Sequence, residues 1–279
     1  MILIADSGST KTIWCCIEND NNNTILCNTS GINPFYLNTN EIIQLLNNEF
    51  KLHNKNISSI FFYGAGCIHE KKEVLYNALK SYFNAENIFI ESDLFGAAHS
   101  LCQNKAGIAC ILGTGSNSCY YDGVKIVQNI TPLGFILGDE GSGAFLGKKL
   151  IADILKNQLS KDLSKYFFEE HPLSTNQILD NIYRKPFPNR FLAQFTKFIA
   201  KHINHLEINM LVNTSFQEFI TRNILQYENA LHLPINFTGS VAYIFKANLE
   251  KVIHDNNLKM GTISQNPIEG LIRYHLKNK

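Results

Sequence analysis

Two stretches of this chain follow the same order of residue types, one in each half. The first reads ILIADSGSTKTIWCCIEND (2–20) and the second reads GIACILGTGSNSCYYDGVK (107–125). Each begins with an apolar strand, continues through a turn of small residues with Ser and Thr, and ends with a second strand and a polar turn. In register, Asp6 corresponds to Gly113, Gly8 to Gly115 and Ser9 to Ser116. This repetition predicts two related domains, each offering one glycine-rich hairpin to a shared cleft.

The order of the predicted elements favours an α/β fold. Strands are expected at 2–5, 12–17, 24–27, 57–63, 88–90 and 233–238, and helices at 41–50, 73–83, 94–102, 143–157, 176–184, 190–203, 207–226, 241–255 and 268–276. Strands that alternate with helices indicate a sheet with a parallel part and helical crossovers. We expect one domain at 1–105 and another at 106–279, with the last helix, about 266–279, packing back on the first.

Composition excludes several classes of protein. The chain has 279 residues, 45% of them hydrophobic, and a formal net charge of +1. Its basic residues are spread out, which argues against binding of nucleic acid or of an acidic lipid surface. No targeting signal or membrane span is predicted. The seven cysteines form no CxxC pair and lie mostly in apolar surroundings, so buried free thiols and a cytoplasmic enzyme are expected.

The turns of the two hairpins suit a phosphate ligand. Successive backbone N–H groups in a glycine-rich turn form an anion site, and Ser and Thr hydroxyls add donors. Asp6 would repel phosphate unless a cation lay between them, so we expect it to act as a Mg²⁺ partner, directly or through water. Lys11 adds positive charge. The alternative is a pair of tight hairpins that bind no ligand.

Asp93 lies where a predicted strand ends and a predicted helix begins. Such strand ends are where ligand-binding residues project in α/β sheets. A kinase that acts on an alcohol needs a carboxylate within hydrogen-bond reach of the hydroxyl, to accept its proton. Asp93 could equally cap the helix that follows it, and the residues alone leave both interpretations open.

Five motifs together resemble one family. Residues 6–12 (DSGSTKT) resemble the first phosphate motif of the sugar-kinase, chaperone and actin ATPase superfamily, 112–117 (LGTGSN) its second, and 237–242 (FTGSVA) its adenosine motif. They occur in the expected order over almost the whole chain. With SDLFGAA (92–98) and LGDEGSG (137–143), the chain is most similar to the N-acetylglucosamine kinase branch, which is grouped with the BadF/BadG/BcrA/BcrD ATPases.

The resemblance implies a fold and an activity. The fold is two ribonuclease H-like (actin-like ATPase) domains, each a mixed five-stranded sheet with helices, and the active site lies in the cleft between them. The activity is transfer of the γ-phosphate of ATP, with Mg²⁺, to the 6-hydroxyl of N-acetylglucosamine, by a protein that is a homodimer.

The implied contacts of the site can be assigned to residues of this chain. The phosphates contact Gly8, Ser9, Thr10, Lys11, Gly113, Thr114, Gly115 and Ser116; the adenosine contacts Gly239 and Ser240; the sugar contacts Asn33, Asp93, Gly138 and Asp139; Asp93 is the catalytic base and Asp6 the metal ligand.

Three other functions stay open. The acceptor could be glucosamine or N-acetylmuramic acid. The chain could be a BadF-type ATPase activator of a dehydratase or reductase, which carries an iron–sulphur cluster between subunits; here Cys67 and Cys102 are the plausible exposed ligands. It could also be a nucleotide sensor without transfer chemistry, although such a protein has no use for two acids on the sugar side.

Overall fold

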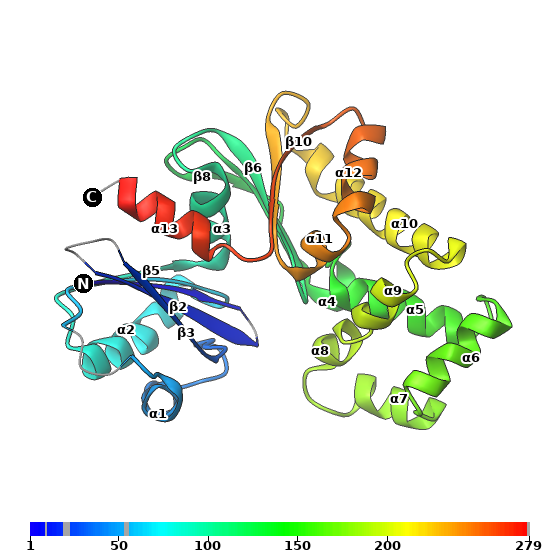
Figure 1. Ribbon diagram of the computed structural model, residues 1–279, viewed down its shortest axis with the longest axis horizontal. Helices are drawn as coiled ribbons and strands as arrows, with labels where there is room; N and C mark the ends of the chain where they lie inside the picture. Colours follow the sequence, from blue (N-terminus) through cyan, green and yellow to red (C-terminus); the bar gives the residue numbers. More distant parts are fainter. Residues whose placement is uncertain (9, 19–22, 53–55, 278–279) are drawn as a thin grey trace. The chain divides into compact units, whose positions relative to one another are not determined.

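The structure is a computed structural model that describes residues 1–8, 10–18, 23–52 and 56–277. The chain forms two compact units (Figure 1). The first comprises Met1–Lys105 and Asn266–Lys279, and the second comprises Ala106–Gln265.

The first unit is built on a mixed sheet. Its described residues form five strands in the order β3-β2-β1-β4-β5. The bounds are β1 (Ile2–Ser7), β2 (Lys11–Ile17), β3 (Thr24–Ser30), β4 (Ser59–Gly64) and β5 (Asn87–Ser92). β1 pairs antiparallel with β2 and parallel with β4, and β4 pairs parallel with β5. The carboxyl ends of β1, β4 and β5 therefore share one edge of the sheet.

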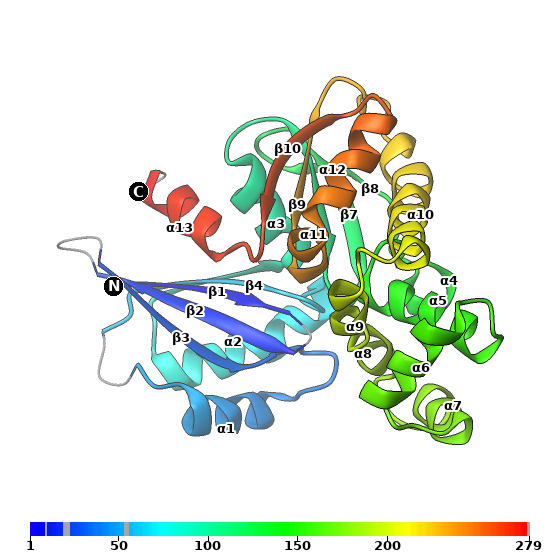
Figure 2. The same ribbon diagram turned by 45° about the vertical axis from the view of Figure 1, so that its right-hand side comes forward.

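Helices cover both faces of this sheet (Figure 2). Helices α1 (Thr39–Glu49) and α2 (His69–Phe83) cover one face, and α3 (Asp93–Cys102) and α13 (Ile268–Lys277) cover the other. Alternation along β1 explains this arrangement, because successive side chains of a strand point to opposite faces. Leu3 and Ala5 enter the core beneath α1 and α2, whereas Ile4 packs with Leu271 of α13.

The second unit repeats the same sheet. Its described residues form five strands in the order β10-β9-β6-β7-β8, with β6 antiparallel to β7 and parallel to β9. The bounds are β6 (Gly107–Leu112), β7 (Ser116–Tyr121), β8 (Ile126–Asn129), β9 (Pro234–Thr238) and β10 (Lys259–Ser264). The predicted fold of two ribonuclease H-like sheets is confirmed. The sequence pattern alone missed β10, although the repeat requires a strand equivalent to β5.

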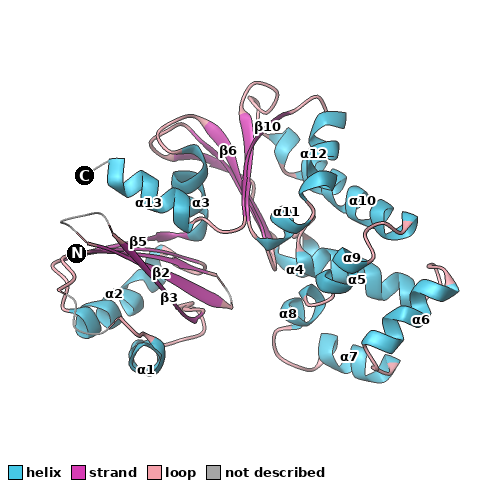
Figure 3. Ribbon diagram, viewed as in Figure 1, coloured by secondary structure: helices cyan, strands magenta, loops and turns pink. Residues whose placement is uncertain are grey.

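The second unit carries most of the helices (Figure 3). They are α4 (Gly134–Leu137), α5 (Gly143–Leu155), α6 (Lys161–Glu170), α7 (Thr175–Tyr183), α8 (Pro188–Ala193), α9 (Thr196–Lys201), α10 (Leu206–Arg222), a 3₁₀ turn (Ile224–Gln226), α11 (Ser240–Ile244) and α12 (Lys246–Asp255). The single helix expected at 190–203 is wrong: it divides into α8 and α9, where the Thr196 hydroxyl bonds the Ala193 carbonyl. The expected helix 241–255 likewise divides at Phe245.

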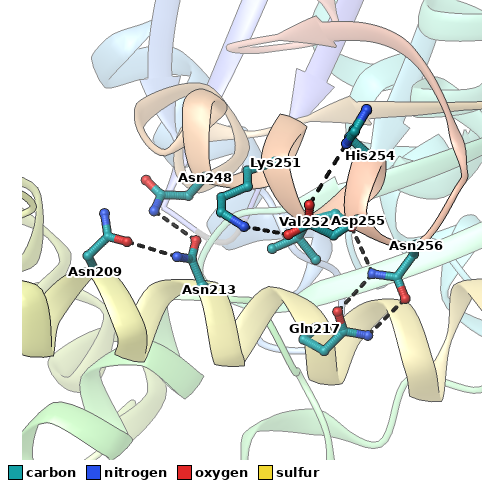
Figure 4. A network of polar contacts seen from close by, with 9 residues as sticks. All are labelled: Asn209, Asn213, Gln217, Asn248, Lys251, Val252, His254, Asp255 and Asn256. Atoms are coloured by element: carbon teal, nitrogen blue, oxygen red, sulfur yellow. Dashed lines mark hydrogen bonds and ion pairs between the residues drawn. The ribbon is translucent and has the colours of Figure 1, made fainter.

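Amide side chains join α10 to α12 (Figure 4). Asn209, Asn213 and Gln217 recur every four residues and so lie on one face of α10. Asn248 donates to Asn213, which donates to Asn209, over 2.9 and 2.8 Å. Gln217 and Asn256 exchange two hydrogen bonds of 3.0 and 2.7 Å. This polar contact fixes the register of the two helices beside their apolar contacts.

The cysteines are free thiols, as expected, and all of them lie in the described part of the chain. The expectation that Cys67 and Cys102 are exposed is wrong, because Cys67 is 3% exposed and Cys102 7%. Cys67 packs in the core beneath α1 and α2, and Cys102 is buried on α3. Among the described residues, no helix is both long enough and apolar enough to cross a bilayer.

A buried tyrosine and two buried histidines join α13 to β4 and α3 within the first unit. The Tyr63 hydroxyl lies 3.0 Å from Nδ1 of His99 on α3 and 3.0 Å from Nε2 of His275 on α13. Burial lowers the pKa of His99 to about 3, assisted by the nearby His275, and burial lowers the pKa of His275 to about 4. Both imidazoles are therefore neutral in the folded protein at neutral pH.

This triad predicts acid sensitivity of the first unit. A histidine of the unfolded chain takes up a proton below about pH 6.5, whereas His275 in the folded protein does not until about pH 4. The folded state therefore has its full free energy of unfolding above pH 6.5, and that free energy decreases as the pH falls from 6.5 toward 4. Glutamine does not titrate, so the free energy of unfolding of His275→Gln should fall by roughly 3 kcal/mol less than that of the wild type over this pH range.

Urea denaturation between pH 4.5 and 7.5 measures this effect, because Trp14 is the only tryptophan and is buried in the first unit. Its fluorescence therefore reports unfolding of that unit. The same pH dependence in the wild type and in His275→Gln would contradict the assignment.

Candidate active site

Asp6 and Asp93 lie at the same edge of the first sheet. Asp6 is the penultimate residue of β1, and the last residue, Ser7, pairs with Gly64 of β4. Gly64 in turn pairs with Ser92 of β5, and Asp93 follows directly. The parallel register therefore brings to one edge two carboxylates that the sequence placed far apart.

The two carboxylates influence each other. Burial raises the pKa of Asp6 to about 7, and the negative charge of Asp93 adds to that rise. Burial also raises the pKa of Asp93, although the hydrogen bond from Leu94 N–H opposes this. Two carboxylates that repel each other in a poorly hydrated place form a donor set that a divalent cation would stabilise.

Ser92, and not Asp93, is the N-cap of α3. The Ser92 hydroxyl accepts from the N–H of Phe95 over 3.2 Å, three residues ahead, as an N-cap side chain does. Asp93 is the first residue of the helix, and its Oδ1 accepts from the adjacent Leu94 N–H, over 2.9 Å. The alternative interpretation, in which Asp93 serves as the N-cap of the helix that follows it, is therefore wrong.

Asn33 lies against the loop that follows β4. Its amide oxygen accepts from Phe35 N–H over 2.9 Å, which fixes the side chain in a local turn. A Cβ atom on Gly66 would lie 2.2 Å from that oxygen, and Gly66 has φ +78°. Only glycine lets the loop pass so closely. The amide nitrogen of Asn33 is then the atom that could donate to a ligand.

The first hairpin uses two of its hydroxyls to hold itself together. Ser7 and Thr12 are fully buried, their hydroxyl oxygens are 2.7 Å apart, and Ser7 also bonds both the carbonyl and the N–H of Ile32. Gly8 N–H donates to the Lys11 carbonyl over 3.0 Å. Thr10 and Lys11 are exposed at the tip. Ser9, a predicted phosphate contact, lies outside the described residues.

The second hairpin has the same internal hydrogen bond. Gly113 N–H donates to the Gly115 carbonyl over 3.0 Å. The Gly113 and Thr114 carbonyls accept from Gly143 and Ala144, at the start of α5, over 2.8 and 3.0 Å. The amides of Thr114 and Gly115 are then the turn donors that could face a phosphate.

Asp139 is fixed against this second hairpin. Its Oδ1 accepts from Ser116 N–H over 3.2 Å, and a Cβ on Gly115 would lie 3.0 Å from its Oδ2. Burial raises the pKa of Asp139, while the Ser116 hydrogen bond lowers it. Gly138, just before it, donates to the Gly134 carbonyl over 2.8 Å. The predicted sugar-binding acid therefore touches the predicted phosphate hairpin within one unit.

The adenosine motif also meets the second hairpin. A Cβ on Gly239 would lie 2.3 Å from the Leu112 carbonyl oxygen, and Gly239 has φ +119°. Ser240 then begins α11. Two motifs that are far apart in the sequence are thus in backbone contact, which any side chain at Gly239 would prevent.

Sequence reasoning missed one part of the site. Glu140 is buried, and its Oε1 lies 2.7 Å from Nε of Arg222 at the end of α10. Both residues line a depression of about 70 Å³ that also includes Ser116, Asp139 and the segment 130–133. Glu140 could have been noticed beside Asp139, but nothing in the local sequence marks Arg222 as its partner.

Magnesium fits the Asp6 carboxylate of the first unit. Among the described residues, no group of three His, Cys, Asp or Glu side chains gathers to form a metal cage made of protein ligands alone. Mg²⁺ does not require one, because it binds through one or two carboxylates and takes its other ligands from water and substrate phosphates. Asp6 supplies such a carboxylate, and the pKa raised by burial and by the charge of Asp93 shows that a cation there would be favourable.

Similar solved structures define the class of protein. A protein from Porphyromonas gingivalis, provisionally named an N-acetylglucosamine kinase, is 46% identical over 100% of this chain and 99% of its own, with a TM-score of 0.96. One from Chromobacterium violaceum, with the same provisional name, is 14% identical over 98% of each chain, with a TM-score of 0.77. A ROK family glucokinase from Streptomyces griseus, in complex with glucose and AMPPNP, is 11% identical over 98% of this chain and 97% of its own, with a TM-score of 0.61.

Neither a protein-family model nor a curated protein matches the chain. The two distant structures establish the fold, which is that of the actin-like ATPases and sugar kinases. At 46% identity over the full length of both chains, this chain belongs to the N-acetylglucosamine kinase-like family.

The contact between Gly239 and the second hairpin gives a prediction. Gly239→Ala places a methyl group against the Leu112 carbonyl and forces a positive φ on alanine, which should cost about 1–3 kcal/mol of stability. Gly113→Ala is the matched control, because nothing lies within 4 Å of a Cβ at that position. Melting temperatures check this: Gly239→Ala should melt several degrees below Gly113→Ala, and equal values would contradict the contact.

Proposed function

We propose that this protein transfers the γ-phosphoryl group of ATP to the 6-hydroxyl of N-acetylglucosamine. The observation that carries the proposal is full-length similarity, at 46% identity, to a protein provisionally named an N-acetylglucosamine kinase. The arrangement of Asp93 supports it, because this carboxylate is held at a sheet edge while Ser92 caps the helix. A carboxylate in that place is suited to accept a proton.

The proposed reaction needs one proton transfer and one bond exchange. Asp93 accepts the proton of the 6-hydroxyl, the sugar oxygen forms its bond to the γ-phosphorus, and the bond from that phosphorus to the β,γ-bridging oxygen breaks to release ADP. Burial raises the pKa of Asp93, which makes it a better proton acceptor than an exposed aspartate. Asn33 and Asp139 hold other groups of the sugar by hydrogen bonds.

Nucleotide binding is assigned to the small-residue turns. The amides of Thr114 and Gly115 donate to the phosphates. The other phosphate contacts are assigned to Gly8, Ser9, Thr10, Lys11, Gly113 and Ser116, and the adenosine contacts to Gly239 and Ser240. Magnesium, held at Asp6, would neutralise charge on the phosphates and on the leaving group.

The depression beside Asp139 favours a neutral sugar. The Arg222 guanidinium, which lines this depression, is paired with the Glu140 carboxylate. Among the lining residues that the structure describes, the depression therefore offers an acidic sugar no unpaired cation. We expect N-acetylglucosamine to be phosphorylated much better than N-acetylmuramic acid, which carries a carboxylate.

Two wider features complete the proposal. The protein functions in the cytoplasm, where ATP is available and where its free buried thiols stay reduced. It acts as a homodimer, as its family resemblance implies. An iron–sulphur activator is disfavoured, because Cys67 and Cys102, its candidate ligands, are buried.

A coupled assay of ADP release across a panel of sugars tests the proposed function. N-acetylglucosamine, glucosamine, glucose and N-acetylmuramic acid would each be added to protein, ATP and Mg²⁺. We expect the highest kcat/KM with N-acetylglucosamine. ADP release that no sugar increases would contradict the kinase assignment and favour an activator or a sensor.

The role of Asp93 is tested with two neighbouring variants. Asp93→Asn keeps a side-chain acceptor for Leu94 N–H but cannot take a proton, so kcat should fall by roughly 10²–10⁴-fold with little loss of stability. Ser92→Ala removes the cap and should cost about 1 kcal/mol of stability with most of kcat retained.

Kinetics and melting temperatures would be measured on the same preparations of these two variants and of the wild type. A folded Asp93→Asn protein with turnover near that of the wild type would remove Asp93 as the base.

A further inference from the structure

The loop at 138–142 holds its two adjacent carboxylates against different neighbours. Asp139 meets the second hairpin through Ser116 N–H. Glu140 meets the end of α10, where Arg222 Nε lies 2.7 Å from Oε1 and Asn223 Nδ2 lies 3.4 Å from Oε2. Both oxygens of Glu140 are therefore held from α10, while those of Asp139 face the hairpin.

Because Glu140 is buried, breaking its ion pair with Arg222 would be strongly destabilising. The Glu140 side chain is 7% exposed, whereas that of Arg222 is 57% exposed. A buried carboxylate without its partner is strongly unfavourable, so Glu140 must keep Arg222 or move toward water. Moving Glu140 would move the backbone that it shares with Asp139.

The backbone of the loop needs such support. Asp139 has φ +58°, a left-handed conformation that is uncommon for residues other than glycine, and Gly141 has φ +71°. A Cβ on Gly141 would lie 3.1 Å from Phe219 Cβ and 3.3 Å from Phe216 Cδ1, both on α10. Gly141, the residue after Glu140, thus packs against the same helix that holds the Glu140 carboxylate.

We propose that Arg222 is a positioning residue, which holds Glu140 and thereby fixes the left-handed backbone at Asp139 and the direction of the Asp139 carboxylate, to which the proposed function assigns the acceptor sugar. The proposal rests on the proposed function, because it assigns Asp139 to the sugar. Arg222 itself does not touch the reacting atoms. Its effect reaches the site through one ion pair and one peptide unit.

Three variants and a matched control test the proposal. Arg222→Ala and Glu140→Gln each remove the ion pair, while Arg222→Lys keeps the charge and loses the guanidinium geometry. The control is Glu218→Gln, which breaks the Lys149–Glu218 pair, also 2.7 Å long, between α5 and the same helix α10. Glu218 lies one turn before Arg222 and is not among the residues lining the depression.

The kinetic result expected is a change in sugar affinity. Arg222→Ala and Glu140→Gln should raise the KM for N-acetylglucosamine by roughly 10- to 100-fold, because a misplacement of about 1 Å can cost that much. The KM for ATP should stay within about twofold, and kcat should fall less than the sugar KM rises. Arg222→Lys should recover part of the loss, and Glu218→Gln should match the wild type.

Hydrogen exchange separates this inference from the proposed function. The amides of residues 138–142 should exchange faster in Arg222→Ala than in Glu218→Gln, whether or not any sugar is phosphorylated. A wild-type protein inactive on every sugar would overturn the proposed function, while faster exchange would still support the positioning of the loop by Arg222.

Two outcomes would overturn the role of Arg222. One is an unchanged sugar KM with unchanged loop exchange in Arg222→Ala. The other applies if Arg222→Ala does not fold: Glu140→Gln would then decide, and a sugar KM and loop exchange equal to those of the wild type would contradict the proposal.

Discussion

The parallel pairing of β1, β4 and β5 is the constraint on which the first half of the site depends. Parallel strands end at one edge of a sheet, and the register of Ser7 with Gly64 and of Gly64 with Ser92 places Asp6 and Asp93 at that edge. A shift of one residue would turn these side chains to the opposite face. The apolar alternation that buries Leu3 and Ile4 on opposite faces therefore also fixes the two carboxylates.

The polar residues of the motifs divide between folding and chemistry. Ser7 and Thr12 are buried and bond each other, so they hold the first hairpin closed. Ser92 caps α3, which leaves the neighbouring Asp93 carboxylate for another task. In the second unit, Glu140 is bound by α10, whereas Asp139 meets the hairpin. Side chains next to one another in the sequence thus have separate roles.

The sequence predicted those features that local pattern determines. The repeated hairpins predicted two equivalent sheets, and the apolar run before Asp93 predicted that this residue lies between a strand and a helix. Local pattern did not predict β10, whose residues Lys259–Ser264 have little apolar alternation; its pairing with β9 holds it in the sheet. Nor did it predict the division of the helices at Phe195 and Phe245, or the partner of Glu140. These depend on contacts between distant residues, which one sequence does not display.

The central claim is that a sugar hydroxyl, and not water, receives the phosphoryl group. Phosphorus and proton NMR of the products from N-acetylglucosamine and ATP tests it most directly. The account predicts one phosphorylated sugar per ADP, with the phosphate on the 6-oxygen, and no ADP above background when the sugar is the 6-deoxy analogue. ADP accompanied by inorganic phosphate and unmodified sugar would contradict it.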